Sequence, residues 1–187
     1  MNLHGKTVLI TGAAHGLGRQ LALLLDALGC SLFLTDCGTA GVSALARELS
    51  KAPKIFICDL SDLRERQGLL RTIKEQMPMD ILINCAGVGS HSQLSQLTVD
   101  EIERVMQINT LAPLELIAGL SPLELVANIG SVAGEMNLPS MSLYAASKTS
   151  MHAFTRSIQL EGARALLVIL GPLSGTDFAQ SIAHPHT

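Results

Sequence analysis

The hydrophobic residues of this chain follow two alternating patterns, short continuous runs and longer stretches with helical spacing. The first run covers Thr7–Thr11 and ends in a glycine cluster, and Leu17–Leu28 then carries leucines at the spacing of a helix. Short apolar runs bounded by turn residues are typical of buried strands, whereas an apolar stripe at helical spacing indicates a helix. The start of the chain therefore predicts a strand, a turn and a helix.

The same alternation continues toward the carboxyl end. Further strands are expected at Ser31–Thr35, Lys54–Cys58, Ile81–Ile83, Leu123–Ile129 and Ala165–Leu170. Helices are expected at Ala40–Ser50, Ser61–Met77, Val99 to about Leu120 and Tyr144 to about Leu160. Thr98 and Glu101 form a capping box before the third of these helices, and Pro113 predicts a kink or break within it.

This order of elements predicts an α/β fold with a doubly wound parallel sheet and helices on both faces. No linker, repeat or low-complexity tract divides the 187 residues, so residues 1–187 are expected to form a single domain with a flexible tail from about residue 178. Ligands of such sheets bind beyond the carboxyl ends of the strands. Candidate functional residues are therefore sought where strands end.

Composition narrows the possible partners. Hydrophobic residues make up 48% of the chain and aromatic residues only 3%, a mixture suited to a buried parallel sheet. The formal net charge is -3 and no basic run occurs, so neither nucleic acid nor an anionic membrane surface is an expected partner. A small-molecule substrate is favoured.

The cysteines and the lengths of the apolar runs indicate the cellular compartment of the protein. No metal-binding spacing or disulfide framework is evident, so no metal is expected at Cys30, Cys37, Cys58 and Cys85. No apolar run reaches the roughly 18 residues of a membrane span, and the amino terminus has no signal-peptide pattern. Reduced thiols and these absences predict a cytoplasmic protein.

A glycine turn joins the first strand to the first helix. Glycines at this position let the backbone approach a pyrophosphate, and the helix amino terminus adds unpaired N–H groups and a positive dipole end. The same glycines also fit a purely steric role in a tight turn. The predicted pyrophosphate site comprises Gly12, His15, Gly16, Leu17 and Gly18.

Two acidic residues follow later strands. Asp36 ends the second strand, where a carboxylate can bind the ribose hydroxyls of an adenosine or simply shape the turn. Its charge would repel a 2′-phosphate, and the adjacent Cys37 cannot neutralise one, so NAD(H) is predicted in preference to NADP(H). Asp59 follows the third strand and is compatible with either an adenine contact or a cap for the helix near Ser61.

Tyr144 and Lys148 lie four residues apart at the start of a predicted helix, so their side chains share one face. A free phenol titrates near pH 10, and a fixed ammonium beside it would lower its pKa toward neutrality. This pair is therefore predicted to transfer protons, with a lowered Tyr144 pKa. The same spacing also occurs on helices that have no catalytic role.

Taken in order, these motifs resemble the short-chain dehydrogenase/reductase superfamily of classical type, which has a Rossmann fold. The resemblance covers about Gly5 to Thr176. It is carried by Thr11, Gly12, Gly16, Gly18, Asn84, Cys85, Ala86, Gly87, Asn109, Ser131, Tyr144 and Lys148. Several motifs spaced in series are much more specific than any one of them.

The resemblance implies a role for each matched residue. Tyr144 would be the general acid/base, Ser131 would hydrogen-bond the substrate oxygen, and Lys148 would bind the nicotinamide ribose and lower the Tyr144 pKa. Asn109 would hold a water molecule that links Lys148 to solvent. The remaining cofactor contacts would come from Asn84, Ala86, Gly87 and Thr176.

The chain also departs from this pattern. Cys85 replaces the usual second asparagine, Gly171 and Pro172 reverse the usual Pro-Gly order, and the sequence ends soon after Thr176, without the expected substrate lid and last strand. The leading hypothesis is an NAD(H)-dependent oxidoreductase that interconverts an alcohol and a ketone or aldehyde. The alternative is a non-catalytic dinucleotide-binding or interaction protein.

Self-association is also expected from the resemblance, as a homodimer or homotetramer built from two helices near the site. The apolar residues considered for this interface are Leu111, Leu114, Ile117, Met151 and Phe154. A core position facing the sheet is the alternative for all of them.

Overall fold

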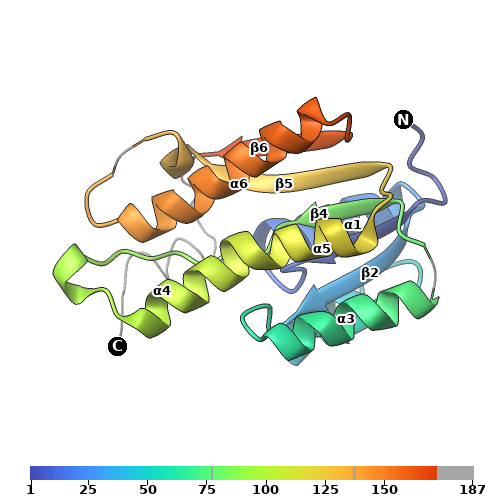
Figure 1. The fold of residues 1–187 in the computed structure, drawn as a ribbon. Coiled ribbons are helices and arrows are strands. Elements are labelled where there is room, and N and C mark those ends of the chain that lie inside the picture. The colour runs from blue at the N-terminus through green and yellow to red at the C-terminus, as the bar shows by residue number, and fades with distance from the viewer. Residues whose placement is uncertain (77, 137, 172–187) are drawn as a thin grey trace.

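The computed structural model describes residues 1–76, 78–136 and 138–171 (Figure 1). In these residues, six strands form one sheet in the order β3-β2-β1-β4-β5-β6, and every neighbouring pair is parallel. Their bounds are Thr7–Thr11 (β1), Ser31–Asp36 (β2), Lys54–Ile57 (β3), Ile81–Asn84 (β4), Leu125–Ser131 (β5) and Ala165–Leu170 (β6). The predicted α/β fold with a doubly wound parallel sheet is confirmed.

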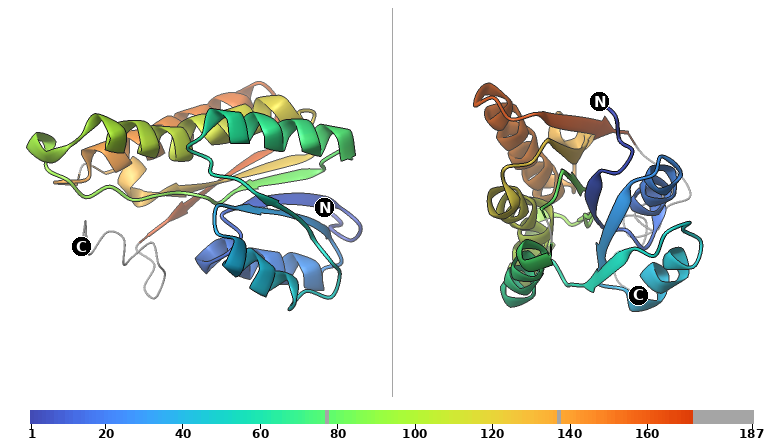
Figure 2. Two further views of the ribbon diagram at one scale, coloured as in Figure 1. Left: turned by 90° about the horizontal axis from the view of Figure 1, so that it is seen from below. Right: turned by 90° about the vertical axis from the view of Figure 1, so that its right-hand side faces the viewer.

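Helices cover both faces of this sheet (Figure 2). Helices α1 and α2 lie on one face, and α3, α5 and α6 lie on the other. The helix bounds are Gly16–Ala27 (α1), Thr39–Ala46 (α2), Leu63–Gln76 (α3), Val99–Met106 (α4), Ala112–Leu120 (α5) and Ser142–Leu160 (α6). Short turns complete the described elements, at Leu94–Gln96 (η1), Gln107–Leu111 (η2) and Val132–Gly134 (η3). Among these helices, none is long and apolar enough to cross a membrane.

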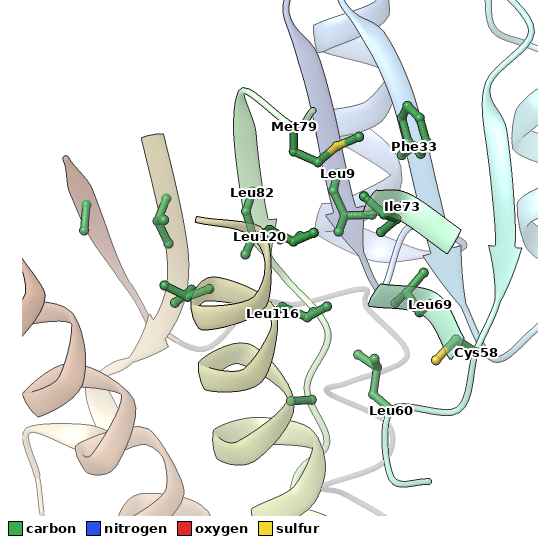
Figure 3. Packing of buried hydrophobic residues seen from close by; sticks show 14 of the residues in the cluster. Leu9, Phe33, Cys58, Leu60, Leu69, Ile73, Met79, Leu82, Leu116 and Leu120 are labelled. Carbon is green, nitrogen blue, oxygen red and sulfur yellow. The ribbon is translucent and has the colours of Figure 1, made fainter. Parts of the chain in front are cut away.

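Two apolar cores result from the alternation of side chains along the central strands. Leu9 of β1 faces α3 and α5, whereas its neighbours Val8 and Ile10 face α1 and α2. Figure 3 shows the first core, in which sheet residues pack against helix residues Leu69, Ile73, Leu116 and Leu120. Because both faces of the central strands are covered, β1, β2 and β4 are largely buried and apolar, whereas the outer strands β3 and β6 keep exposed side chains.

Several element ends differ from the sequence-based expectation. Helix α2 ends at Ala46 rather than Ser50, and the Ser50 N–H and hydroxyl instead donate to the Asp26 carboxylate. Helix α3 begins at Leu63 rather than Ser61, because the Asp62 carboxylate accepts the first free N–H groups of the helix. Side-chain hydrogen bonds therefore set both ends.

The irregularity expected near Pro113 lies earlier. Residues Gln107–Leu111 form a π-helical turn between α4 and α5, and Pro113 lies in the first turn of α5. The residues before Pro113 are already helical, so this proline, which has no N–H to donate, lies within a continuous helical stretch, and the π-helical turn directly before it is the irregularity. Strand β5 is likewise displaced, beginning at Leu125 and ending at Ser131, because pairing with β4 starts at Leu125 opposite Ile81.

Candidate dinucleotide and catalytic site

The glycine turn after β1 has a backbone that other residues would not fit. Gly12 has a φ of 66°, and a Cβ atom on it would lie 2.8 Å from the Ala86 Cα. A Cβ on Gly18 would lie 2.1 Å from the Gly12 carbonyl oxygen. These glycines are required for close approach between β1, the loop after β4 and α1.

Helix α1 begins directly after this turn with no side-chain cap. His15 occupies the N-cap position and its side chain makes no capping hydrogen bond. The first N–H groups of the helix thus retain donor capacity at the positive end of its dipole. Together with glycines that leave the backbone uncovered, this geometry fits the pyrophosphate of a dinucleotide.

The loop after β4 is fixed against the same turn. Thr11 Oγ accepts the N–H groups of Cys85 and Ala86, each at 3.0 Å. Asn84 is buried, and its Nδ2 donates to Asn128 Oδ1 on β5 at 2.8 Å. Ala86 therefore lies beside the glycine turn, while Asn84, the last residue of β4, ties that strand to β5.

Asp36 joins the ends of two strands. Its Oδ2 accepts the Ala14 N–H at 3.0 Å, and its Oδ1 accepts the Gly38 N–H at 3.0 Å. The carboxylate thus holds the glycine turn against the loop that leads to α2. Each carboxylate oxygen has a second lone pair, so these bonds leave acceptor capacity for a ribose hydroxyl.

Asp59 and His15 lie at the margin of this region. The Asp59 carboxylate accepts the Ser61 N–H and hydroxyl, and these bonds hold the pKa of Asp59 below its usual value. The helix-cap alternative for Asp59 is wrong, since Asp62 performs that role. His15 is exposed and its ring lies against Gly41 of α2.

Ser131, Tyr144 and Lys148 come together where β5 ends and α6 begins. The Ser131 hydroxyl lies close enough to the Tyr144 hydroxyl to influence its titration. Lys148 Nζ donates to the Ile129 carbonyl at 2.9 Å and lies 5.8 Å from the centroid of the Tyr144 ring. The trio selected from the sequence therefore forms one cluster.

Burial governs the titration of this cluster. Tyr144 is 4% exposed, and its burial raises its pKa above the usual value, although the Ser131 hydroxyl acts in the opposite direction. The lowered Tyr144 pKa predicted from the Tyr144–Lys148 spacing is therefore wrong for the protein without cofactor. Burial also lowers the pKa of Lys148 to about 8, because the ammonium loses its hydration.

Asn109 lies in the π-helical turn and bridges two elements of the site. Its Oδ1 accepts the Val88 N–H at 2.9 Å, while its Nδ2 donates to the Val88 carbonyl at 2.9 Å and to Ser147 Oγ at 3.0 Å. A Cβ on Gly87 would lie 3.4 Å from Asn109 Oδ1 and 3.5 Å from Lys148 Nζ. Asn109 and Lys148 thus flank Gly87.

Two further polar residues of the site, Asn128 and His152, were not predicted from the sequence. Asn128 Oδ1 accepts a hydrogen bond from Asn84, and Asn128 Nδ2 donates one to Thr155 Oγ at 2.9 Å. His152 Nε2 accepts the Ser131 N–H. These three bonds span 21 to 44 residues, so no local spacing marks them. Thr176, the expected nicotinamide contact, lies outside the described residues.

A glycine turn after the first strand, an acidic residue at the end of the second and a Ser-Tyr-Lys cluster at the end of the fifth are the features of a dinucleotide-binding α/β protein. Residues 6–185 match the family model described as short chain dehydrogenase. The chain belongs to this family of oxidoreductases. It is 31% identical over 169 residues to a 3-oxoacyl-[acyl-carrier-protein] reductase from Vibrio harveyi, covering 86% of this chain and 69% of that protein.

Solved structures give the same result. A short-chain dehydrogenase from Sphingobium yanoikuyae in complex with NADPH has a TM-score of 0.89 and 28% identity, covering 95% of this chain and 75% of that one. A short-chain dehydrogenase/reductase from Burkholderia phymatum in complex with NAD has a TM-score of 0.86 and 25% identity, covering 96% and 70%. Similar proteins therefore bind either cofactor.

Proposed function

We propose that this protein is an NAD(H)-dependent oxidoreductase that interconverts an alcohol and a ketone or aldehyde. The observation that carries the proposal is the proximity of the Ser131 and Tyr144 hydroxyls, with Lys148 beside the Tyr144 ring, at the same end of the sheet as the glycine turn. Two hydroxyls so placed can both reach a single substrate oxygen. A turn that serves only for packing has no need of such a pair.

In the reductive direction, a nicotinamide held at this site would supply the hydride that the carbonyl carbon accepts. Ser131 donates a hydrogen bond to the carbonyl oxygen, and Tyr144 donates its hydroxyl proton to that oxygen, so the product is a neutral alcohol. The tyrosinate that remains is stabilised by the Lys148 ammonium and is reprotonated from solvent. Asn109 assists by holding a water molecule beside Lys148.

The cofactor would lie across the carboxyl ends of β1, β2 and β4. The amino terminus of α1 and the glycine turn would hold the pyrophosphate, through Gly12, His15, Gly16, Leu17 and Gly18. Asp36 would bind the adenosine ribose, and further contacts would come from Asp59, Asn84, Ala86, Gly87, Lys148 and Thr176. The Asp36 carboxylate favours NAD(H), because it would repel the 2′-phosphate of NADP(H).

The test is NADH oxidation measured across a panel of ketones and aldehydes, with the Tyr144→Phe variant as the key comparison. Loss of the general acid should reduce kcat by about a thousandfold while NADH affinity changes little. Phenylalanine keeps the buried ring, so the variant should fold. Full turnover by Tyr144→Phe would overturn the proposal.

The alternative is a non-catalytic dinucleotide-binding protein. The burial of Tyr144, which raises its pKa, is the observation in its favour, because an acid/base group works best when its pKa lies near the operating pH. This alternative predicts NADH binding without turnover of any carbonyl compound. The same panel, together with a binding titration, separates the two functions.

We further expect a homodimer or homotetramer in a reducing cytoplasm, where the four free cysteines would stay reduced. Of the residues considered for the interface, Ile117 and Met151 are buried in the subunit, whereas Leu111 is 40% exposed. Any interface would therefore use the exposed Leu111 and would not use Ile117 or Met151. Sedimentation at micromolar concentration tests this expectation.

A further inference from the structure

A buried imidazole lies directly behind Ser131. His152 is on α6, one turn beyond Lys148, and is 1% exposed. A Cβ on Gly130 would lie 2.4 Å from its Nε2, and a Cβ on Gly134 would lie 2.6 Å from its Cε1. The imidazole therefore fills a space that exists only because both neighbouring residues are glycines.

The hydrogen bonds of His152 define its tautomer. The Ser131 N–H points at Nε2 at 3.3 Å, and a backbone N–H can only donate, so Nε2 must be the acceptor. The ring proton then lies on Nδ1, which donates to Glu135 Oε1 at 2.9 Å. Arg156 Nη2 donates to the same carboxylate oxygen at 2.6 Å. A continuous chain thus connects Arg156, Glu135, His152 and Ser131.

Strand β5 shows why this acceptor is needed. Its pairing with β4 ends at Asn128 opposite Asn84, so Ile129–Ser131 extend past β4. In a parallel pair of strands, a residue on one strand bonds to the two residues that flank its opposite residue on the other strand. It donates its N–H to the carbonyl of the preceding residue and accepts the N–H of the following residue. Around Gly130, the Lys148 ammonium donates to the Ile129 carbonyl and His152 accepts the Ser131 N–H. Two side chains of α6 therefore replace the missing strand.

We infer that His152 is a positioning residue, which holds the Ser131 backbone by its N–H so that the Ser131 hydroxyl stays against Tyr144. Glu135 supports this role by keeping the imidazole proton on Nδ1. The inference rests on the proposed function for its catalytic consequence. Its structural part is independent of any substrate.

Three substitutions of His152 distinguish the effect of its Nε2 acceptor from the effect of its ring volume. In His152→Gln, the amide oxygen can reach the Nε2 position and accept the Ser131 N–H. In His152→Asn, the shorter amide reaches only the Nδ1 position, so the bond to Glu135 is kept and the bond to Ser131 is lost. His152→Leu preserves volume and loses both bonds.

The single tyrosine of the chain gives a readout that needs no substrate. The sequence contains one tyrosine and no tryptophan, so tyrosinate absorbance reports on Tyr144 alone. Because the nearby Ser131 hydroxyl lowers the Tyr144 pKa, losing that contact should raise the pKa further. We expect this rise in His152→Asn and His152→Leu, and a value close to wild type in His152→Gln.

Thr149→Val is the matched control. Thr149 Oγ donates to the Gly134 carbonyl at 3.0 Å, so the variant removes another bond between α6 and η3 without contacting Ser131. Its Tyr144 titration should equal that of wild type. With a ketone that the panel identifies, kcat should fall about tenfold in the Asn and Leu variants, with NADH affinity unchanged and activity retained in the Gln variant.

The outcomes are distinguishable. An unchanged Tyr144 titration in all three His152 variants would overturn the positioning role. An equal shift in all three that follows their loss of thermal stability would also overturn it, because ring volume would then be the cause. If no ketone is turned over but the Asn and Leu variants still shift the titration, the proposed function fails and the positioning of Ser131 stands.

Discussion

The two ends of the site are held together by different forces. At the glycine turn, backbone segments pack so closely that a Cβ on Gly18 would lie 2.1 Å from the Gly12 carbonyl oxygen. At the catalytic end, the geometry depends on side-chain hydrogen bonds between distant residues, such as Asn109 to Ser147 and His152 to Ser131. Close backbone packing dominates at the first end, where Thr11 and Asp36 add side-chain hydrogen bonds, and side-chain hydrogen bonds dominate at the second.

This difference predicts different responses to substitution. Close backbone packing has no tolerance for added atoms, so changes at the glycine turn should impair folding and cofactor binding together. A hydrogen-bonded cluster can lose one bond and remain folded, so changes at the catalytic end should separate stability from turnover. The following predictions test that contrast.

The largest effect is expected from Gly12→Ala. A methyl group would meet the Ala86 backbone, and alanine disfavours the φ of 66° at this position. Strain of about 1–3 kcal/mol from the backbone and a similar cost from overpacking should lower the free energy of unfolding by about 2–6 kcal/mol. NADH affinity, measured by fluorescence titration, should fall with it.

Gly68→Ala is the matched control. Gly68 lies within α3, and a Cβ there would meet nothing within 4 Å. Alanine should raise the free energy of unfolding by about 0.5–1 kcal/mol, because it favours a helix interior more than glycine does. Equal destabilisation of both variants would contradict a special role for the glycine turn.

The next effect concerns Lys148 and pH. Its pKa is about 8 in the folded protein and 10.5 when the side chain is solvated, so between these values the unfolded chain binds the additional proton. The free energy of unfolding should therefore rise with pH across this window, by about 3 kcal/mol relative to Lys148→Met. Below pH 8, the folded protein carries the full cost of burying the ammonium.

Denaturant unfolding at pH values from about 8 to 10 measures that difference. The raised Tyr144 pKa acts with the opposite sign, lowering stability only above pH 10, and is present in both proteins. Parallel pH profiles for wild type and Lys148→Met would mean that Lys148 is solvated. Such a result would also weaken the contrast between the two ends of the site.

Much of the fold could be predicted because the relevant signals are local. The runs at Thr7–Thr11 and Ala165–Leu170 match β1 and β6 at both ends. The glycines, Asp36 and the Tyr144–Lys148 spacing placed candidate residues on elements that the structure brings to one sheet edge. Each of these features depends on residues close together in sequence.

The remainder depends on tertiary context. The pairing of Asn84 with Asn128 spans 44 residues, and nothing near either residue indicates it. The sign of the Tyr144 pKa shift was wrong for the same reason, since the Tyr144–Lys148 spacing reports a nearby charge but not the burial that outweighs it. Likewise, Pro113 suggested a break that the π-helical turn before it makes unnecessary.

Asp36 gives a smaller, selective effect. Asp36→Ala should weaken NADH binding by about ten- to a hundredfold, since hydrogen bonds to a charged group contribute roughly 1.5–3 kcal/mol. NADPH should lose little affinity or gain some, because the repulsive charge is removed. If wild type binds NADPH more tightly than NADH, the proposed cofactor preference is wrong.

Asp36 also holds the glycine turn, so a second variant is needed to separate this structural role from the effect of its charge. Asp36→Ala also leaves the Ala14 and Gly38 N–H groups without their acceptor, so part of the loss would come from the turn itself. Asp36→Asn removes the charge and keeps one acceptor oxygen. A turn effect lowers NADH and NADPH affinity alike, whereas a charge effect changes their ratio in both variants.

The smallest effect is expected from Ser147→Ala, at the catalytic end. Ser147 Oγ accepts from Asn109 and donates to the Tyr144 carbonyl at 2.7 Å, so alanine removes two buried hydrogen bonds. Asn109 keeps both bonds to Val88, and its free N–H costs about 1–2 kcal/mol of unfolding free energy. We expect NADH affinity to stay within about twofold of wild type, because Ser147 contacts no part of the glycine turn. A parallel loss of stability and NADH affinity, as predicted for Gly12→Ala, would show that the two ends of the site are not held independently.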